Sequence, residues 1–139
     1  MAVRCWDAQL DIFMMDDVQE WAHGLKLSRK ITNFGRDFSD AVFAAEIIFL
    51  YEPKMVQLHS YSNAVSKGRK RTNWEVLNRN ALKKLGLVLS ADKIEKIVDL
   101  APNFVENFLW ELKSRLLKFA EKKANQLNGR KFEIDDAGS

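Results

Sequence analysis

Two groups of cationic side chains are the residues in this 139-residue sequence whose type and spacing could do chemistry. Residues 26–36 hold four cations and no carboxylate, and residues 66–84 hold seven cations against one carboxylate, Glu75. From residue 92 to 139, by contrast, nine cations and nine carboxylates cancel. Clustered Lys and Arg side chains attract polyanions. The sequence therefore predicts an anion-binding surface, or, as the plain alternative, a solvated face that keeps the domain soluble.

The sequence offers no local motif for catalysis, nucleotide binding or metal coordination. Its six glycines form neither a Walker nor a dinucleotide-binding pattern. Cys5 is the single cysteine, and neither His23 nor His59 has a histidine partner four residues away, so a zinc site lacks ligands. Ser, His and Asp residues are all present, so residue type alone does not exclude a triad assembled in space. We expect a binding module, not an enzyme, with no cofactor and no metal.

Length and composition indicate a single soluble domain. A chain of 139 residues that is 47% hydrophobic can bury a core without disulfides. Its longest apolar run, residues 41–51, is interrupted by Glu46 and is far shorter than the roughly 20 residues that cross a bilayer. Acidic residues near the start argue against a signal peptide, and the single cysteine suits a reducing compartment. We expect a cytoplasmic protein without membrane insertion.

The pattern of apolar residues is helical through most of the chain, and no segment alternates as a strand does. Residues 38–51 are apolar almost all round, which is typical of a helix surrounded by other helices. Asp37 is its predicted N-cap, and Pro53 is its predicted stop. The predicted fold class is therefore all-α, a single compact helical bundle with a central buried helix at about 38–51.

A second predicted helix carries part of the basic residues. It runs from about residue 73 to 85, after an irregular stretch at 54–71 that places Arg69, Lys70 and Arg71 in a loop. Arg79 and Lys83, four residues apart, share its outer face. Trp74 lies on its inner face, where Asn78 is expected to be a buried amide with its hydrogen bonds satisfied. We predict that Trp74 and Phe49 belong to the core.

Several short motifs follow one another along the chain: Leu27-Ser28-Arg29, Arg36-Asp37-Phe38-Ser39-Asp40, Ala44-Ala45-Glu46-Ile47, Pro53-Lys54-Met55-Val56, Asn73-Trp74, Leu77-Asn78-Arg79 and Leu82-Lys83-Lys84-Leu85. Taken together, these motifs resemble the calponin-homology domain of the sperm flagellar protein 1 (CLAMP) family. The resemblance covers about residues 14–120. The combined order and spacing of the motifs are specific to the family, whereas each motif alone is weak evidence. Ala41 departs from the pattern, because the family usually has glycine there, and we expect this to be a mild change within a helix.

The resemblance implies a domain organisation and a cellular setting. Residues 1–13 have no clear counterpart and form an N-terminal extension, residues 14–123 form the calponin-homology domain, and residues 124–139 form a tail. That tail either leads toward a coiled coil or is a non-native end of the chain. Family members look like microtubule-binding proteins of motile cilia, flagella and cortical arrays. The resemblance thus implies a cytoskeletal, axonemal location and a full-length protein that dimerises through a C-terminal coiled coil.

Charge and resemblance together predict microtubules as the partner, because microtubules present a carboxylate-rich surface. The predicted contact residues are Arg29, Lys30, Arg36, Lys54, Arg69, Lys70, Arg71, Arg79 and Lys83. For Arg29 and Arg36 the alternative is a salt bridge to Asp37 or Asp40, and for Arg79 and Lys83 it is plain solvation. We also predict that the two basic clusters act as one surface.

Two other binding functions compete with this interpretation. An actin-binding or signalling calponin-homology domain is one, although strong actin binders of this fold usually look like tandem domains and the chain has room for one. A nucleic-acid-binding basic domain is the other. The outer face of the helix that carries Arg79 and Lys83 offers only Asn80 as a group suited to base edges. We therefore expect no nucleic-acid partner.

Overall fold

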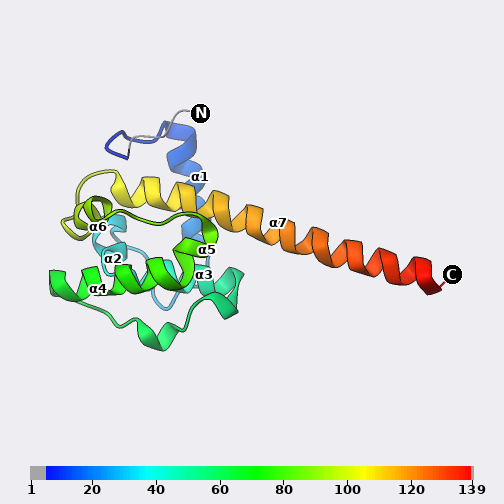
Figure 1. Ribbon diagram of the computed structural model, residues 1–139. Helices are drawn as coiled ribbons and strands as arrows, with labels where there is room; N and C mark the ends of the chain where they lie inside the picture. Colours follow the sequence, from blue (N-terminus) through cyan, green and yellow to red (C-terminus); the bar gives the residue numbers. More distant parts are fainter. Residues whose placement is uncertain (1–5, 139) are drawn as a thin grey trace.

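The computed structural model describes the backbone of residues 6–138 and the side chains of residues 6–126 (Figure 1). The described residues form helices and contain no strand, which confirms the predicted all-α class. In chain order the elements are α1 (Ile12–His23), α2 (Phe34–Phe38), α3 (Val42–Tyr51), η1 (Pro53–Met55), η2 (Leu58–Ser60), α4 (Lys67–Leu77), η3 (Asn78–Leu82), α5 (Lys83–Leu85), α6 (Ala91–Val98) and α7 (Phe104–Gly138).

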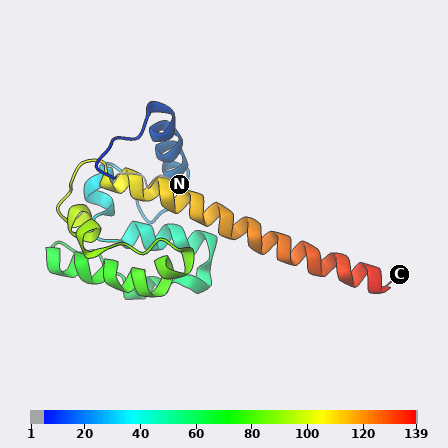
Figure 2. The same ribbon diagram turned by 45° about the horizontal axis from the view of Figure 1, so that its top comes forward.

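The first half of α7 is the element around which the others pack. It contacts α1, α2, α3, α5 and α6. Its buried stripe consists of Val105, Phe108, Leu109, Leu112 and Leu116. The second half of α7 extends away from the bundle (Figures 1 and 2), and residues 120–126 are exposed. Within the described part of the chain, no helix is long and apolar enough to cross a membrane.

The predicted central helix is divided by a turn. The short helix α2 ends at Phe38, and α3 begins at Val42. Ala41, between them, has a left-handed φ of 67°, so it does not lie in a helix as we expected. Asp37 is therefore inside α2 and is not a cap; Asn33 caps α2 instead. Apolar periodicity did not reveal this break because apolar residues continue on both sides of it.

Two side chains of α4 hold the turn between α2 and α3. The Trp74 indole N–H donates to the Ser39 carbonyl at 2.8 Å, and the Asn73 amide donates to the Asp40 carbonyl at 2.9 Å. Trp74 is fully buried and stands edge-on to the Phe108 ring, with 5.2 Å between ring centroids. The prediction that Trp74 belongs to the core is confirmed. The same prediction for Phe49 is wrong, because Phe49 is 36% exposed.

The segments α4, η3 and α5 form one continuous helix from Lys67 to Leu85. Its first residue, Lys67, follows a Ser66 N-cap and lies six residues before the predicted start, so Arg69, Lys70 and Arg71 are helical rather than in a loop. Along Asn78–Leu82 the helix widens into a π-turn, in which the Lys83 N–H reaches the Asn78 carbonyl. The Asn78 side chain exchanges two hydrogen bonds with the Leu89 backbone, at 2.8 and 2.9 Å, which confirms the predicted satisfied amide.

The chain before α1 packs onto the bundle. Trp6 is 5% exposed and contacts the rings of Phe104 and Phe108. The buried Asn107 amide donates to the Trp6 and Ala8 carbonyls at 3.1 and 2.8 Å. Residues 6–11 are thus attached to α7 by both apolar contacts and hydrogen bonds.

The left-handed conformation of Ala41 predicts that glycine is tolerated better there than at an alanine inside α3. An alanine at residue 41 costs about 1–2 kcal/mol, and glycine removes that cost while losing a buried methyl group worth about 0.8 kcal/mol. We expect Ala41→Gly to change the free energy of unfolding by less than about 1 kcal/mol. Ala44→Gly, in the interior of α3, should lower it by about 2 kcal/mol, from lost helix propensity and the same lost methyl. Urea denaturation measures the free energy of unfolding of both variants. Equal losses of stability in the two variants would contradict backbone strain at Ala41.

Candidate anion-binding surface

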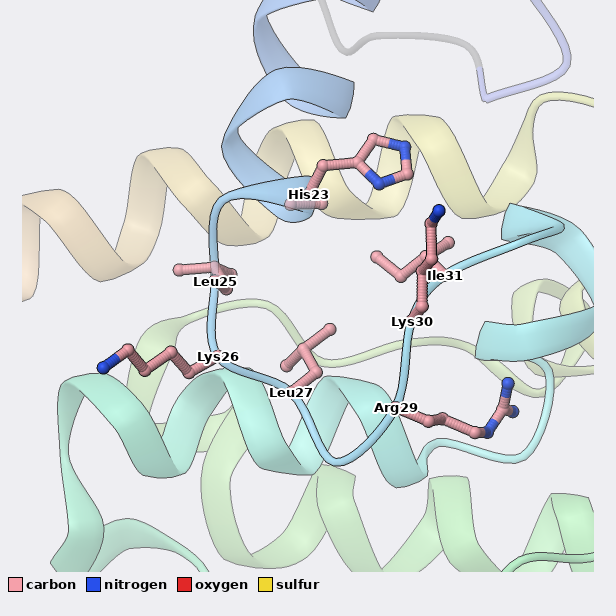
Figure 3. A pocket seen from close by; sticks show the side chains of 8 residues that line it. His23, Leu25, Lys26, Leu27, Arg29, Lys30 and Ile31 are labelled. Carbon is pink, nitrogen blue, oxygen red and sulfur yellow. The ribbon is translucent and has the colours of Figure 1, made fainter.

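The basic loop, residues 24–33, connects α1 to α2 and has the shape of a U (Figure 3). Lys26 lies on one arm, and Arg29 and Lys30 lie on the other. The bend is attached to α3 through Glu46, whose two carboxylate oxygens accept hydrogen bonds from the Ser28 N–H and the Ser28 hydroxyl, each at 2.7 Å. This contact holds the loop against the helix.

Asp37 holds the end of the basic loop. One of its oxygens accepts hydrogen bonds from the backbone N–H groups of Thr32 and Asn33, at 2.8 and 3.0 Å. The other oxygen lies 3.4 Å from Arg29 and 3.7 Å from Arg36. Burial raises the pKa of Asp37, but the hydrogen bonds from Asn33 and Thr32 and the charge of Arg29 outweigh it, so this pKa lies below its ordinary value.

Arg29 and Arg36 therefore form the salt bridges that we considered as an alternative, and their shared partner is Asp37. Their side chains are nevertheless 50% and 65% exposed. The Arg29 guanidinium also lies over the Phe43 ring, 4.7 Å from its centroid. One carboxylate between two guanidinium groups leaves an excess positive charge at this point. The pairing positions both groups at the surface without neutralising them.

A second cationic site is a groove of about 340 Å³ between the segment 54–57 and the long helix. We call it the basic groove; it is lined by Lys54, Met55, Val56, Gln57, Arg79, Asn80 and Lys84. No carboxylate lines it, and no ion pair within 4 Å involves its three cations among the described residues. Two predicted contact residues, Lys54 and Arg79, thus meet across one concave surface although they lie far apart in sequence.

The π-turn explains why Lys84 lines the groove and why the sequence did not identify it. In an α-helix the neighbour of Arg79 along one face is Lys83, four residues on. In a π-turn the hydrogen bonds join residues five apart, which brings residues 79 and 84 to one side. Lys83 is exposed but does not line the groove. The sequence signal that could have identified Lys84 was its membership of the basic cluster at residues 66–84, because its spacing from Arg79 is not that of one α-helical face.

The start of α4 carries the remaining predicted residues. Arg69 is exposed and Lys70 is half-buried, and neither has an ion pair among the described residues. Arg71 differs, because it forms a salt bridge with Glu95 of α6, and this hydrogen bond raises the pKa of Arg71. Lys67 is paired similarly with Asp99, at 2.8 Å. Arg71 is therefore the predicted contact residue whose charge is most directly compensated.

The described residues thus contain three groups of cations: the basic loop with Arg36, the basic groove, and the first turns of α4. No three His, Cys, Asp or Glu side chains in the part of the chain that the structure describes gather in a way that could hold a metal ion. The arrangement is suited to holding carboxylate or phosphate groups at a solvent-exposed surface. Whether the three groups act as one surface stays a prediction.

The sequence is similar to known flagellar proteins. The family model described as "CH-like domain in sperm protein" matches residues 18–114. Sperm flagellar protein 1 from Xenopus laevis is 39% identical over 108 residues, which are 78% of this chain and 47% of that protein. The proteins of the same name from Bos taurus and Homo sapiens are each 45% identical over 96 residues, 69% of this chain and 41% of theirs. The chain spans less than half the length of these relatives.

The role of Asp37 predicts a pH-dependent stability difference. We expect Asp37→Asn to lower the free energy of unfolding at pH 7 by about 1–3 kcal/mol, because charge-assisted hydrogen bonds are lost. The pKa of Asp37 in the folded protein lies below the ordinary 3.8, so its stabilisation is present above that value and is lost as the pH falls through the folded-state pKa. Urea denaturation from pH 7 downward should show the gap to wild type closing.

The exposed Asp16 of α1 provides the control. Asp16→Asn should leave the unfolding free energy within about 0.5 kcal/mol of wild type. A gap for Asp37→Asn that stays constant below pH 4 would show that the buried charge is not the source of the stabilisation.

Proposed function

This chain belongs to the family of the CH-like domain in sperm protein, a family of cytoskeletal calponin-homology domains, and from that premise we propose that it is a microtubule-binding module. The related proteins are named for the sperm flagellum. We therefore place the protein in the cytoskeleton of a cilium or flagellum. There it binds microtubules through its basic surface and bundles or stabilises them.

The observation that carries this proposal is the basic groove. Lys54, Arg79 and Lys84 converge on a concave surface that contains no carboxylate. Cations that form no close ion pair keep most of their charge for an external partner, and a concave site concentrates the field. The surface of a microtubule is rich in carboxylates, so it is complementary to such a site.

The basic loop provides the second contact. Its cations are fixed at the bend by Glu46 and at the end by Asp37. A loop that is already ordered loses less conformational freedom when a partner binds. Arg29, Lys30 and Arg36 are thus held ready for carboxylates at the surface of the domain.

Avidity compensates for the weakness of the individual contacts. Each exposed ion pair contributes about 0–1 kcal/mol and is screened by salt. Two tethered domains on a repeating lattice bind far more tightly than one. We propose that residues 14–123 are the binding domain and that the full-length protein forms a dimer through a coiled coil that follows it. The greater length of the relatives leaves room for such a segment.

Substitutions of two arginines in the long helix test the role of the groove, because each substitution lowers the net charge of the domain by one. We expect Arg79→Gln to weaken microtubule binding up to about fivefold, since one exposed ion pair is worth up to about 1 kcal/mol. Arg71→Gln should have little effect, because Glu95 already compensates this charge. Cosedimentation at one low salt concentration measures both affinities. Equal losses would mean that net charge alone matters and that the groove has no special role.

Arg36 tests the contribution of the loop. Arg36→Gln removes one cation while leaving Arg29 as a partner of Asp37. We expect a several-fold loss of microtubule affinity with the helical circular dichroism spectrum unchanged, because exposed substitutions usually change stability by about 0.5 kcal/mol or less. Lys118→Gln, on the exposed part of α7, is the matched control and should do much less. Undiminished binding of a folded Arg36→Gln domain would remove this residue from the interface.

A further inference from the structure

A pocket of about 500 Å³ lies between the two arms of the basic loop (Figure 3). We call it the loop pocket; it is lined by Ala22, His23, Leu25, Lys26, Leu27, Arg29, Lys30 and Ile31. Leu27 and Ile31 point into the space between the arms. Ala22 and Ile31 are buried, and Leu25 and Leu27 are half-buried against the core. The apolar surface that the pocket opens to solvent therefore comes mainly from Leu25 and Leu27.

Positive charge surrounds these apolar walls. Lys30 extends on the same side as His23, while Lys26 and Arg29 point outward on opposite sides of the loop. Lys26 and Lys30 form no ion pair within 4 Å among the described residues. Apolar and cationic groups are thus combined in one site, which distinguishes the loop pocket from the basic groove.

The loop pocket is held in shape by contacts on its outside. Glu46 binds both polar groups of Ser28 at the bend, and Asp37 binds the backbone of Thr32 and Asn33 beyond the second arm. The His23 ring stands edge-on to the Phe34 ring, with centroids 5.3 Å apart. A pocket formed in advance can receive a side chain without a large ordering cost.

We propose that the loop pocket receives an apolar side chain, aliphatic or aromatic, from an otherwise acidic segment of the partner. An anion alone would leave the accessible parts of Leu25 and Leu27 in water. An apolar segment without carboxylates would leave the surrounding cations without partners. A segment in which carboxylates flank one apolar residue satisfies both sets of groups. The inference builds on the proposed function, because it names the kind of microtubule segment that the basic loop recognises.

Three synthetic peptides test the proposal by nuclear magnetic resonance titration of the isotope-labelled domain. One peptide consists of glutamates around a central phenylalanine, the second has serine in place of phenylalanine, and the third has lysines in place of the glutamates. We expect the first peptide to shift the backbone amide signals of residues 22–31 and to bind about tenfold more tightly than the second, as burial of much of one aromatic side chain allows. The lysine peptide should not bind.

Two matched protein variants test whether the preference for the phenylalanine peptide arises in the loop pocket. Leu27→Ser should reduce the phenylalanine preference to near unity, whereas Leu50→Ser should retain it, because Leu50 is an exposed leucine of α3 that does not line the pocket. Thermal unfolding confirms that each variant is folded. If Leu27→Ser does not fold, a photoreactive phenylalanine analogue in the acidic peptide provides the second measurement, and its cross-links should map to residues 22–31.

The outcomes separate this proposal from the proposed function. Equal affinities of the phenylalanine and serine peptides, no binding of either, or shifts outside residues 22–31 would overturn the loop-pocket proposal. Concentration-dependent self-association that Phe13→Ser abolishes would also overturn it, since the exposed Phe13 of a second copy would then be the occupant. If the wild type cosediments with microtubules while the peptides bind equally, only the pocket proposal fails. If the preference is found without cosedimentation, the pocket proposal holds and the proposed function fails.

Discussion

The structure depends on the burial of a backbone turn, residues 37–41, in which all five consecutive residues are buried. Burying backbone carbonyl groups is costly unless they receive hydrogen bonds. Asn73 and Trp74 supply these bonds from α4, and the same Trp74 ring packs on α7. On the outer side, Asp37 binds the end of the basic loop. One short segment therefore connects the core to the cationic surface.

This arrangement divides the charged residues by function. Carboxylates such as Asp37, Glu46 and Glu95 are used to fix a loop or to join two helices. Five cations without an ion pair among the described residues line a concave surface: Lys54, Arg79 and Lys84 in the basic groove, and Lys26 and Lys30 at the loop pocket. Two arginines of the long helix show the difference: Arg71 is paired with Glu95, whereas Arg79 lines the basic groove without an ion pair among the described residues.

The sequence predicted those features that depend on regular periodicity or on a single strong signal. The core position of Trp74 and the satisfied amide of Asn78 follow from a 3.6-residue period. The turn before α3 was not predictable, because Ala41 carries no signal for a left-handed conformation. Lys84 was missed because the π-turn changes the helical phase, and Phe49 was misplaced because an apolar residue does not reveal which side of a helix lacks a neighbour.

The most direct test of microtubule binding by unpaired cations is cosedimentation of the domain with microtubules, actin filaments and duplex DNA, side by side. It should be run at low ionic strength and at about 0.15 M, where the Debye length is about 8 Å. We predict that the domain sediments with microtubules, that this binding weakens as salt rises, and that the domain stays in solution with actin and DNA. Equal binding to all three polyanions, or binding to microtubules that salt does not affect, would contradict the account.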